Sequence, residues 1–119
     1  MPSEKPANRV QDIIENAQAI LRYTSGMDLA TFEEDRKTYD AIERCLERIA
    51  EAAKLGDLAP VLMPDQPWRI IRALGNRLRH SYDDIAEDRL WEIVQKDLTG
   101  LCAACEGALA RLQTGVDLG

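Results

Sequence analysis

The sequence contains few residues that bind metals: three cysteines and a single histidine among 119 residues. Cys102 and Cys105 form a C-x-x-C pair, but there is no second pair, and His80 alone cannot complete a tetrahedral zinc site. An odd number of cysteines also does not fit a disulfide framework. We therefore expect small buried thiols between helices in a reducing compartment, and neither a metal nor another cofactor.

Long apolar runs and an excess of positive charge are also absent. The sequence has no stretch of about 18 apolar residues, the length needed to span a bilayer. Its first residues, MPSEKPANRV, lack the basic flank and apolar stretch of a secretory signal. We therefore expect a cytoplasmic protein without membrane contact. The formal net charge of −6 argues against broad, sequence-independent binding to DNA, because lysine and arginine supply most of that affinity. Any contact with nucleic acid must use a local basic patch.

Apolar residues recur at helical spacing along almost the whole chain. This pattern predicts one all-α domain over residues 1–119, folded as an up-and-down bundle of four or five helices. The predicted apolar stripes are Val10, Ile13, Ile14, Ala17, Ile20 and Leu21; then Phe32, Tyr39, Ile42, Leu46, Ile49 and Ala53; and last Leu90, Ile93, Val94, Leu98, Leu101 and Leu109.

Turn and capping residues predict where these helices begin and end. The first helix ends near Gly26, and the second begins at a capping box of Thr31 and Glu34 and ends at Gly56. A connection with several prolines leads to a third helix over residues 68–81. A fourth begins with Asp84 and Glu87 in capping positions and continues toward Gln113, bending or breaking at Gly100 or Gly107.

The third helix has two different faces. At about 100° per residue, one side collects Trp68, Ile70, Ile71, Leu74, Gly75, Leu78 and Tyr82. The opposite strip collects Arg69, Arg72, Asn76, Arg79 and His80. Such a strip is either a solvated helix face or a local basic patch that can hold a phosphate.

Three segments of the sequence decide between these interpretations. They are WRIIRALGNRLRHSYDDI, LWEIVQKDLTGL and LRYTSGMDLATFEEDRKTYDAIERCLERIAEAAKLG, which together cover most of the chain. These segments resemble the HepT family, a branch of the HEPN superfamily of small helical proteins. The resemblance implies an all-α symmetric homodimer that cleaves RNA as a toxin and is paired with a minimal nucleotidyltransferase antitoxin.

The signature of that family is an arginine, usually followed by an asparagine, then four to six residues to a histidine, one further residue and a tyrosine. Asn76, His80 and Tyr82 match it in register, whereas Gly75 stands at the position of the signature arginine. Arg72, Arg77 and Arg79 are nearby alternatives for the missing charge. The resemblance also implies that Tyr82 is adenylylated by the partner enzyme.

These residues suggest cleavage of RNA without a metal. His80 is the candidate for proton transfer because an imidazole titrates near neutral pH. Asn76, Tyr82 and Arg79 complete the expected catalytic group, and Arg69, Arg72 and Arg77 are the expected phosphate contacts. One histidine cannot easily serve as both base and acid, so we expect a two-fold dimer to bring a second His80 to one cleft, lined by residues 72–83 of both chains.

Two other interpretations remain open at this stage. The chain could be a catalytically weakened or inactive subunit that binds the nucleotidyltransferase and is adenylylated on Tyr82, which the glycine at position 75 favours. It could also be a plain helical adaptor whose motif only completes a helix. Trp68 and Trp91 are expected to pack in the core, because large aromatic side chains contribute most to core burial.

Overall fold

The computed structural model describes residues 5–54, 58–80 and 85–113, except for the side chains of residues 58, 59 and 80. Within these ranges the chain forms α-helices and no strand. They are α1 (Pro6–Tyr23), α2 (Leu29–Glu33), α3 (Arg36–Ala52), α4 (Leu58–Leu62), α5 (Trp68–His80), α6 (Glu87–Lys96) and α7 (Leu98–Gln113). The predicted all-α fold class is confirmed for the described residues.

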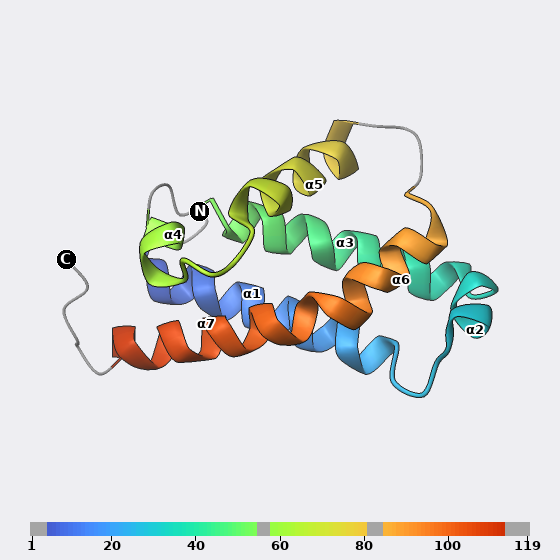
Figure 1. Cartoon of the computed structure of the whole chain (residues 1–119), viewed down its shortest axis with the longest axis horizontal. Helices are drawn as coiled ribbons and strands as arrows, with labels where there is room; N and C mark the ends of the chain where they lie inside the picture. Colours follow the sequence, from blue (N-terminus) through green and yellow to red (C-terminus); the bar gives the residue numbers. More distant parts are fainter. Residues whose placement is uncertain (1–4, 55–57, 81–84, 114–119) are drawn as a thin grey trace.

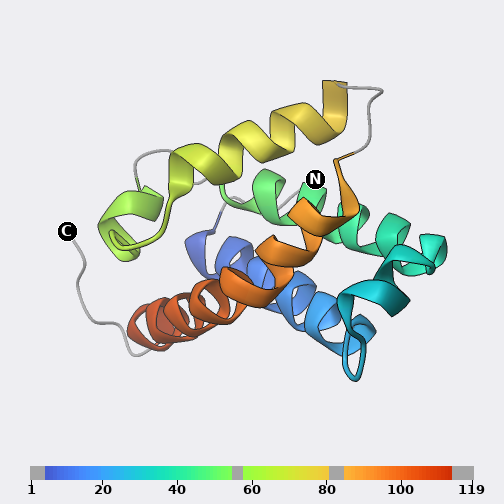
Figure 2. The same cartoon turned by 45° about the vertical axis from the view of Figure 1, so that its right-hand side comes forward.

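The long helices pack around α1. Both α3 and α7 lie against α1, α5 lies on α3, and α6 leads into α7 (Figures 1 and 2). The core forms where the apolar stripes of these helices meet, and every residue of the three predicted stripes is buried or partly buried. The two tryptophans also pack as expected, with Trp68 buried and Trp91 against Phe32.

The predicted second helix is divided into α2 and α3. Asp28 and Thr31 form a reciprocal capping box at the start of α2, and Asp35 accepts hydrogen bonds from Thr38 at the start of α3. The expected capping box of Thr31 and Glu34 is therefore wrong. Each aspartate lies three residues before its threonine and satisfies free backbone N–H groups, so each starts a helix of its own.

The predicted fourth helix is also divided, but not at a glycine. Its interruption falls at Asp97, between α6 and α7, whereas Gly100 and Gly107 both lie inside α7. Ala86 is the N-cap of α6 and makes no side-chain hydrogen bond, so Glu87 is the first helical residue. Asp84, the other expected capping residue, lies outside the described part of the chain.

The connection before α5 is held by three contacts. It contains the short helix α4, which the sequence did not predict. The Trp68 indole donates a hydrogen bond to the Met63 carbonyl at 2.8 Å. Arg111 of α7 donates to the Leu62 carbonyl at 2.6 Å, and the Cys105 thiol lies 3.6 Å from the Met63 sulfur. These contacts fix the position at which α5 begins.

Candidate functional site

Gly75 brings α5 unusually close to α3. A Cβ atom built at Gly75 would lie only 2.4 Å from the Cβ of Ala50, which is closer than real side chains approach. Position 75 is buried in this contact. An arginine at this place would therefore force the two helices apart, which gives a physical reason for the glycine at the signature position.

The guanidinium of Arg79 occupies space beside Gly75. Its Nη1 lies 3.9 Å from the same built Cβ, because side chains on a helix point back toward its N-terminus and no side chain at position 75 stands in the way. Arg79 donates hydrogen bonds to Asn76 Oδ1 at 2.8 Å and to Glu51 Oε2 at 3.2 Å. The chain thus places an arginine head group next to the residue that replaces the signature arginine.

The other described side chains of the α5 strip are more open to solvent than Arg79. Arg69, Arg72 and Asn76 are exposed, as expected for the strip, whereas the Arg79 side chain is only 26% exposed and tied to α3. Arg77 is also exposed but lines the space between α5 and α6. The structure therefore brings Asn76 and Arg79 together by a direct hydrogen bond.

His80 is the last residue of α5, and its side chain lies outside the described part of the structure. Tyr82 lies wholly outside it. The described part of the chain begins again at Ile85, whose carbonyl accepts a hydrogen bond from the buried Tyr39 hydroxyl. The roles expected for His80 and Tyr82 remain predictions.

Three cations from three parts of the fold meet at Glu51, at the end of α3. Lys54 Nζ and Arg79 Nη1 lie 2.9 and 3.2 Å from Glu51 Oε2. Arg9 of α1 donates to the Glu51 carbonyl oxygen at 2.9 Å. We refer to Arg9, Glu51, Lys54 and Arg79 as the Glu51 cluster. The hydrogen bond from Lys54, with the charges of Lys54, Arg79 and Arg9, lowers the pKa of Glu51.

The sequence did not predict this cluster. The three-residue spacing of Glu51 and Lys54 is a helical signal that could have suggested their pair. Arg9 lies 42 residues from Glu51 in the sequence, and Arg79 lies 28 residues from it. No local pattern links residues so far apart, so only the packing of α1 and α5 on α3 shows that these side chains meet.

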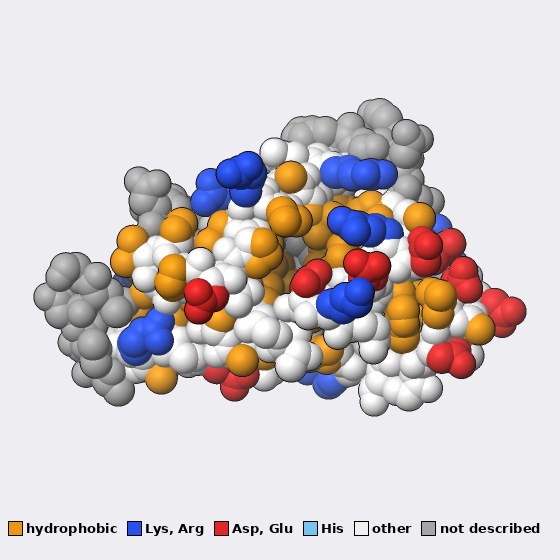
Figure 3. All heavy atoms as spheres, viewed as in Figure 1, with side chains coloured by type: hydrophobic (Ala, Val, Ile, Leu, Met, Phe, Trp, Pro, Cys, Tyr) orange, Lys and Arg blue, Asp and Glu red, His pale blue; other side chains and the backbone are white. Residues whose placement is uncertain are grey.

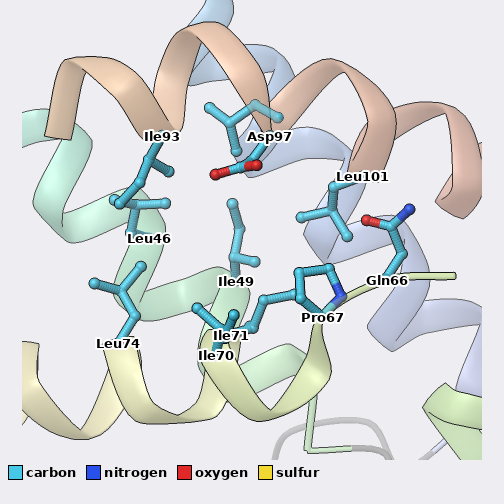
Figure 4. Close-up of a pocket in the computed structure, with 11 residues that line it drawn as sticks. Leu46, Ile49, Gln66, Pro67, Ile70, Ile71, Leu74, Ile93, Asp97 and Leu101 are labelled. Carbon is cyan, nitrogen blue, oxygen red and sulfur yellow. The ribbon is translucent and has the colours of Figure 1, made fainter. Parts of the chain in front are cut away.

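A groove lined by apolar side chains runs beside α5. Figure 4 shows Ile71, Leu74 and Ile93 pointing into a common space between α5 and the α6–α7 pair. The α5–α6 groove, as we call it, has the lining residues Pro67, Ile70, Leu74, Ile93 and Asp97. Hydrophobic side chains are visible on this face in Figure 3, and Ile70, which the sequence placed with the apolar side, is 63% exposed.

The three cysteines lie in the hydrophobic core. Cys45, Cys102 and Cys105 are free and buried, and the described residues contain no group of three or more potential metal ligands. Burial raises the pKa of Cys105 to about 12 and also raises the pKa of Cys102. The thiolate is the form that binds metals and attacks electrophiles, and a raised pKa disfavours it, which agrees with the packing of these two thiols in the core.

The described residues form helices and no strand, which agrees with the helical fold expected of a HepT-like protein. None of the described helices is long and apolar enough to cross a membrane. The sequence model of the HepT-like family, which carries the description "Ribonuclease HepT-like", matches residues 13–59 and 61–107. The chain belongs to this HepT-like ribonuclease family.

Individual relatives agree with this assignment. "Putative RNase MJ0127" of Methanocaldococcus jannaschii is 35% identical over 95 residues, which are 79% of this chain and 78% of the relative. "Probable ribonuclease HepT" of Thermococcus cleftensis is 32% identical over 93 residues, which are 77% of this chain and 84% of the relative. No solved structure significantly matches the chain.

Proposed function

We propose that this chain is a metal-independent endoribonuclease of the HepT type. The main support for this proposal is that Arg79 lies beside Gly75 and donates hydrogen bonds to Asn76 and Glu51. It supplies a fixed guanidinium at the point where the family motif has lost one. Membership of a ribonuclease family and the names of the relatives support the reaction class.

In the proposed reaction, a base removes the proton of the RNA 2'-hydroxyl, and this oxygen attacks the adjacent phosphorus. The bond from phosphorus to the 5'-oxygen breaks, and an acid protonates the leaving oxygen. His80 is the proposed proton-transfer group. Arg79 stabilises the charge that develops on the phosphate, while Arg69, Arg72 and Arg77 hold the strand, because a guanidinium offers parallel donors to phosphate oxygens.

We further propose that two copies form one cleft, so that each His80 can serve a different proton step. The α5–α6 groove supports this pairing, because its apolar lining is bordered by Arg77 and Arg89 and also by Glu92 and Asp97. A two-fold interface presents the same patch twice. A patch that carries both signs of charge can therefore pair with itself.

The wider role that we propose is that of a toxin controlled by a minimal nucleotidyltransferase. Adenylylation of Tyr82, two residues after His80, would add a nucleotide and a negative phosphate next to the arginines of α5. The loss of the signature arginine at Gly75 favours a second candidate function. In that case the chain is an inactive subunit that binds the nucleotidyltransferase and is modified on Tyr82.

Cleavage of RNA by the purified protein in the presence of a metal chelator separates these two functions. We expect cleavage by the wild type, none by His80→Ala, and a loss of about a hundredfold in rate for Arg79→Lys, which keeps the charge but not the planar head group. Arg44→Lys on the exposed face of α3 is the matched control. A wild type that cleaves no RNA, but is adenylylated on Tyr82, would exclude the nuclease and leave the subunit.

A further inference from the structure

The Glu51 cluster extends the basic surface of α5 onto two other helices. Arg79 belongs both to the Glu51 cluster and to the basic surface of α5, because it donates hydrogen bonds to Asn76 on α5 and to Glu51 on α3. Lys54 follows α3 and Arg9 lies in α1, and both contact Glu51. A ligand that contacts α5 at Asn76 can therefore also reach charges on α3 and α1.

The cluster brings three cations to one carboxylate, and its Lys54 and Glu51 side chains are open to solvent. It contains three cations and one carboxylate, in a chain whose formal net charge is −6. The side chains of Lys54 and Glu51 are 49% and 59% exposed. Charged side chains at such exposure contribute little to stability. Their gathering at one point therefore favours a role in binding.

Two of the cations at Glu51 carry head groups of the kinds that bind phosphate. One carboxylate oxygen lies within hydrogen-bond distance of an ammonium and a guanidinium, the two groups that bind phosphate oxygens in proteins. Arg9 is held at the same residue through its backbone carbonyl. A phosphate oxygen that approaches Lys54 would make the same kind of contact that Glu51 Oε2 makes now, next to the Arg79 guanidinium.

We propose that the Glu51 cluster binds a second phosphate of the RNA strand, separate from the phosphate that is cleaved. This inference rests on the proposed ribonuclease function and deepens it. Lys54 and Arg9 supply additional charge, and Arg79 links this subsite to the strip of polar and basic residues on α5. Glu51 gathers the cations in the free protein and competes with the phosphate for them.

This proposal predicts opposite effects for two substitutions in the same cluster. Lys54→Met removes one phosphate contact and should weaken binding about fivefold at about 50 mM salt. It should also reduce the slope of the logarithm of affinity against the logarithm of salt concentration by about 0.7, the value for one contact to single-stranded nucleic acid. Glu51→Gln removes the competing charge and should tighten binding, while the Gln oxygen can still accept from Arg79.

The measurement is fluorescence anisotropy of a labelled single-stranded RNA oligonucleotide of mixed sequence over a series of salt concentrations. The full chain carries His80→Ala in every sample, so that the RNA stays intact. Lys37→Met and Asp40→Asn are matched controls on the same helix. They lie about 20 Å or more along α3 from Lys54, at a rise of about 1.5 Å per residue. Both are expected to leave the affinity and the salt slope close to those of the parent.

Two results would overturn the proposed subsite. One is that Lys54→Met and Lys37→Met show the same dependence of RNA affinity on salt concentration. The other is that Glu51→Gln binds RNA no more tightly than the parent protein. Thermal melts confirm that each variant is folded. Failure of the ribonuclease function is a separate result, because then the wild type cleaves no RNA at all.

Discussion

At the scale of single residues, the contact between Gly75 and Ala50 has the clearest energetic consequence. Gly75→Ala should lower the free energy of unfolding by about 1 to 3 kcal/mol, because the new methyl group overlaps the Ala50 side chain. The measurement is urea denaturation at one fixed protein concentration. Gly100→Ala is the matched control, since nothing lies within 4 Å of its built Cβ.

The control is expected to change stability in the opposite direction. Alanine in a helix interior is more stable than glycine by about 0.5 to 1 kcal/mol, so Gly100→Ala should stabilise the protein. Combining Gly75→Ala with Ala50→Gly removes the overlapping atom and should cost less than the sum of the two single changes. Additive effects in this double variant would show that the close contact is not the cause.

The residue scale also shows where prediction from sequence stops. The strip of Arg69, Arg72 and Asn76 is exposed as its spacing predicted. The pairing of Arg79 with Glu51 was not predicted, because the partners come from different helices. The exposure of Ile70 has the same origin: its helical position suggested burial, but α5 packs on α3 and leaves an open groove beside α6.

At the scale of helices, the positions of the apolar stripes were predictable and the interruptions were not. Spacing of three and four residues identified the buried faces of α1, α3, α6 and α7. The division between α2 and α3 depends on two short hydrogen-bonded caps, at Asp28 and Asp35. The interruption at Asp97 has no glycine or proline to mark it. The apolar pattern is the same whether a helix continues or is interrupted for one or two residues, so it does not predict such breaks.

The cap at Asp35 makes the stability of α3 depend on pH. The backbone N–H of Thr38 and then its hydroxyl group donate to this carboxylate and lower its pKa. A lowered pKa in the folded state means that the stabilisation is present above the unfolded-state pKa of about 4 and is lost as the pH falls through the folded-state value.

Asp35→Asn tests this dependence, because the amide stays uncharged at every pH and its oxygen can still accept from Thr38. We expect the variant to have a lower Tm than the wild type at pH 7 and the difference to shrink as the pH falls below about 4. Asp12→Asn in α1, where the aspartate caps no helix, is the matched substitution. A difference in Tm that stays constant from pH 7 to the acid limit would contradict the assignment.

At the scale of the whole molecule, the proposed cleft requires a second copy of the chain. Ile70→Asp places a charge in the exposed apolar part of the α5–α6 groove and should convert a dimer into a monomer. Light scattering after gel filtration measures the mass, and RNA cleavage should be lost together with the dimer. Val61→Asp on α4 is the control, because Val61 is similarly exposed, at 60%, but does not line the groove.

Two results would argue against this pairing. A wild type that is monomeric at micromolar concentration would remove the need for the groove as an interface. An Ile70→Asp variant that stays dimeric and active would place the interface elsewhere on the molecule. If that variant stays dimeric but loses cleavage, the interface likewise lies elsewhere, and the loss of activity comes from the change in α5 itself.

The contact of Gly75 with Ala50 also constrains how this sequence can change in evolution. Restoring an arginine at position 75 by one substitution would meet the Ala50 side chain before the guanidinium could reach solvent. A route back to the full family motif therefore needs a compensating change on α3 first. Among homologues that keep the glycine, a small residue at position 50 and an arginine at position 79 should be inherited together.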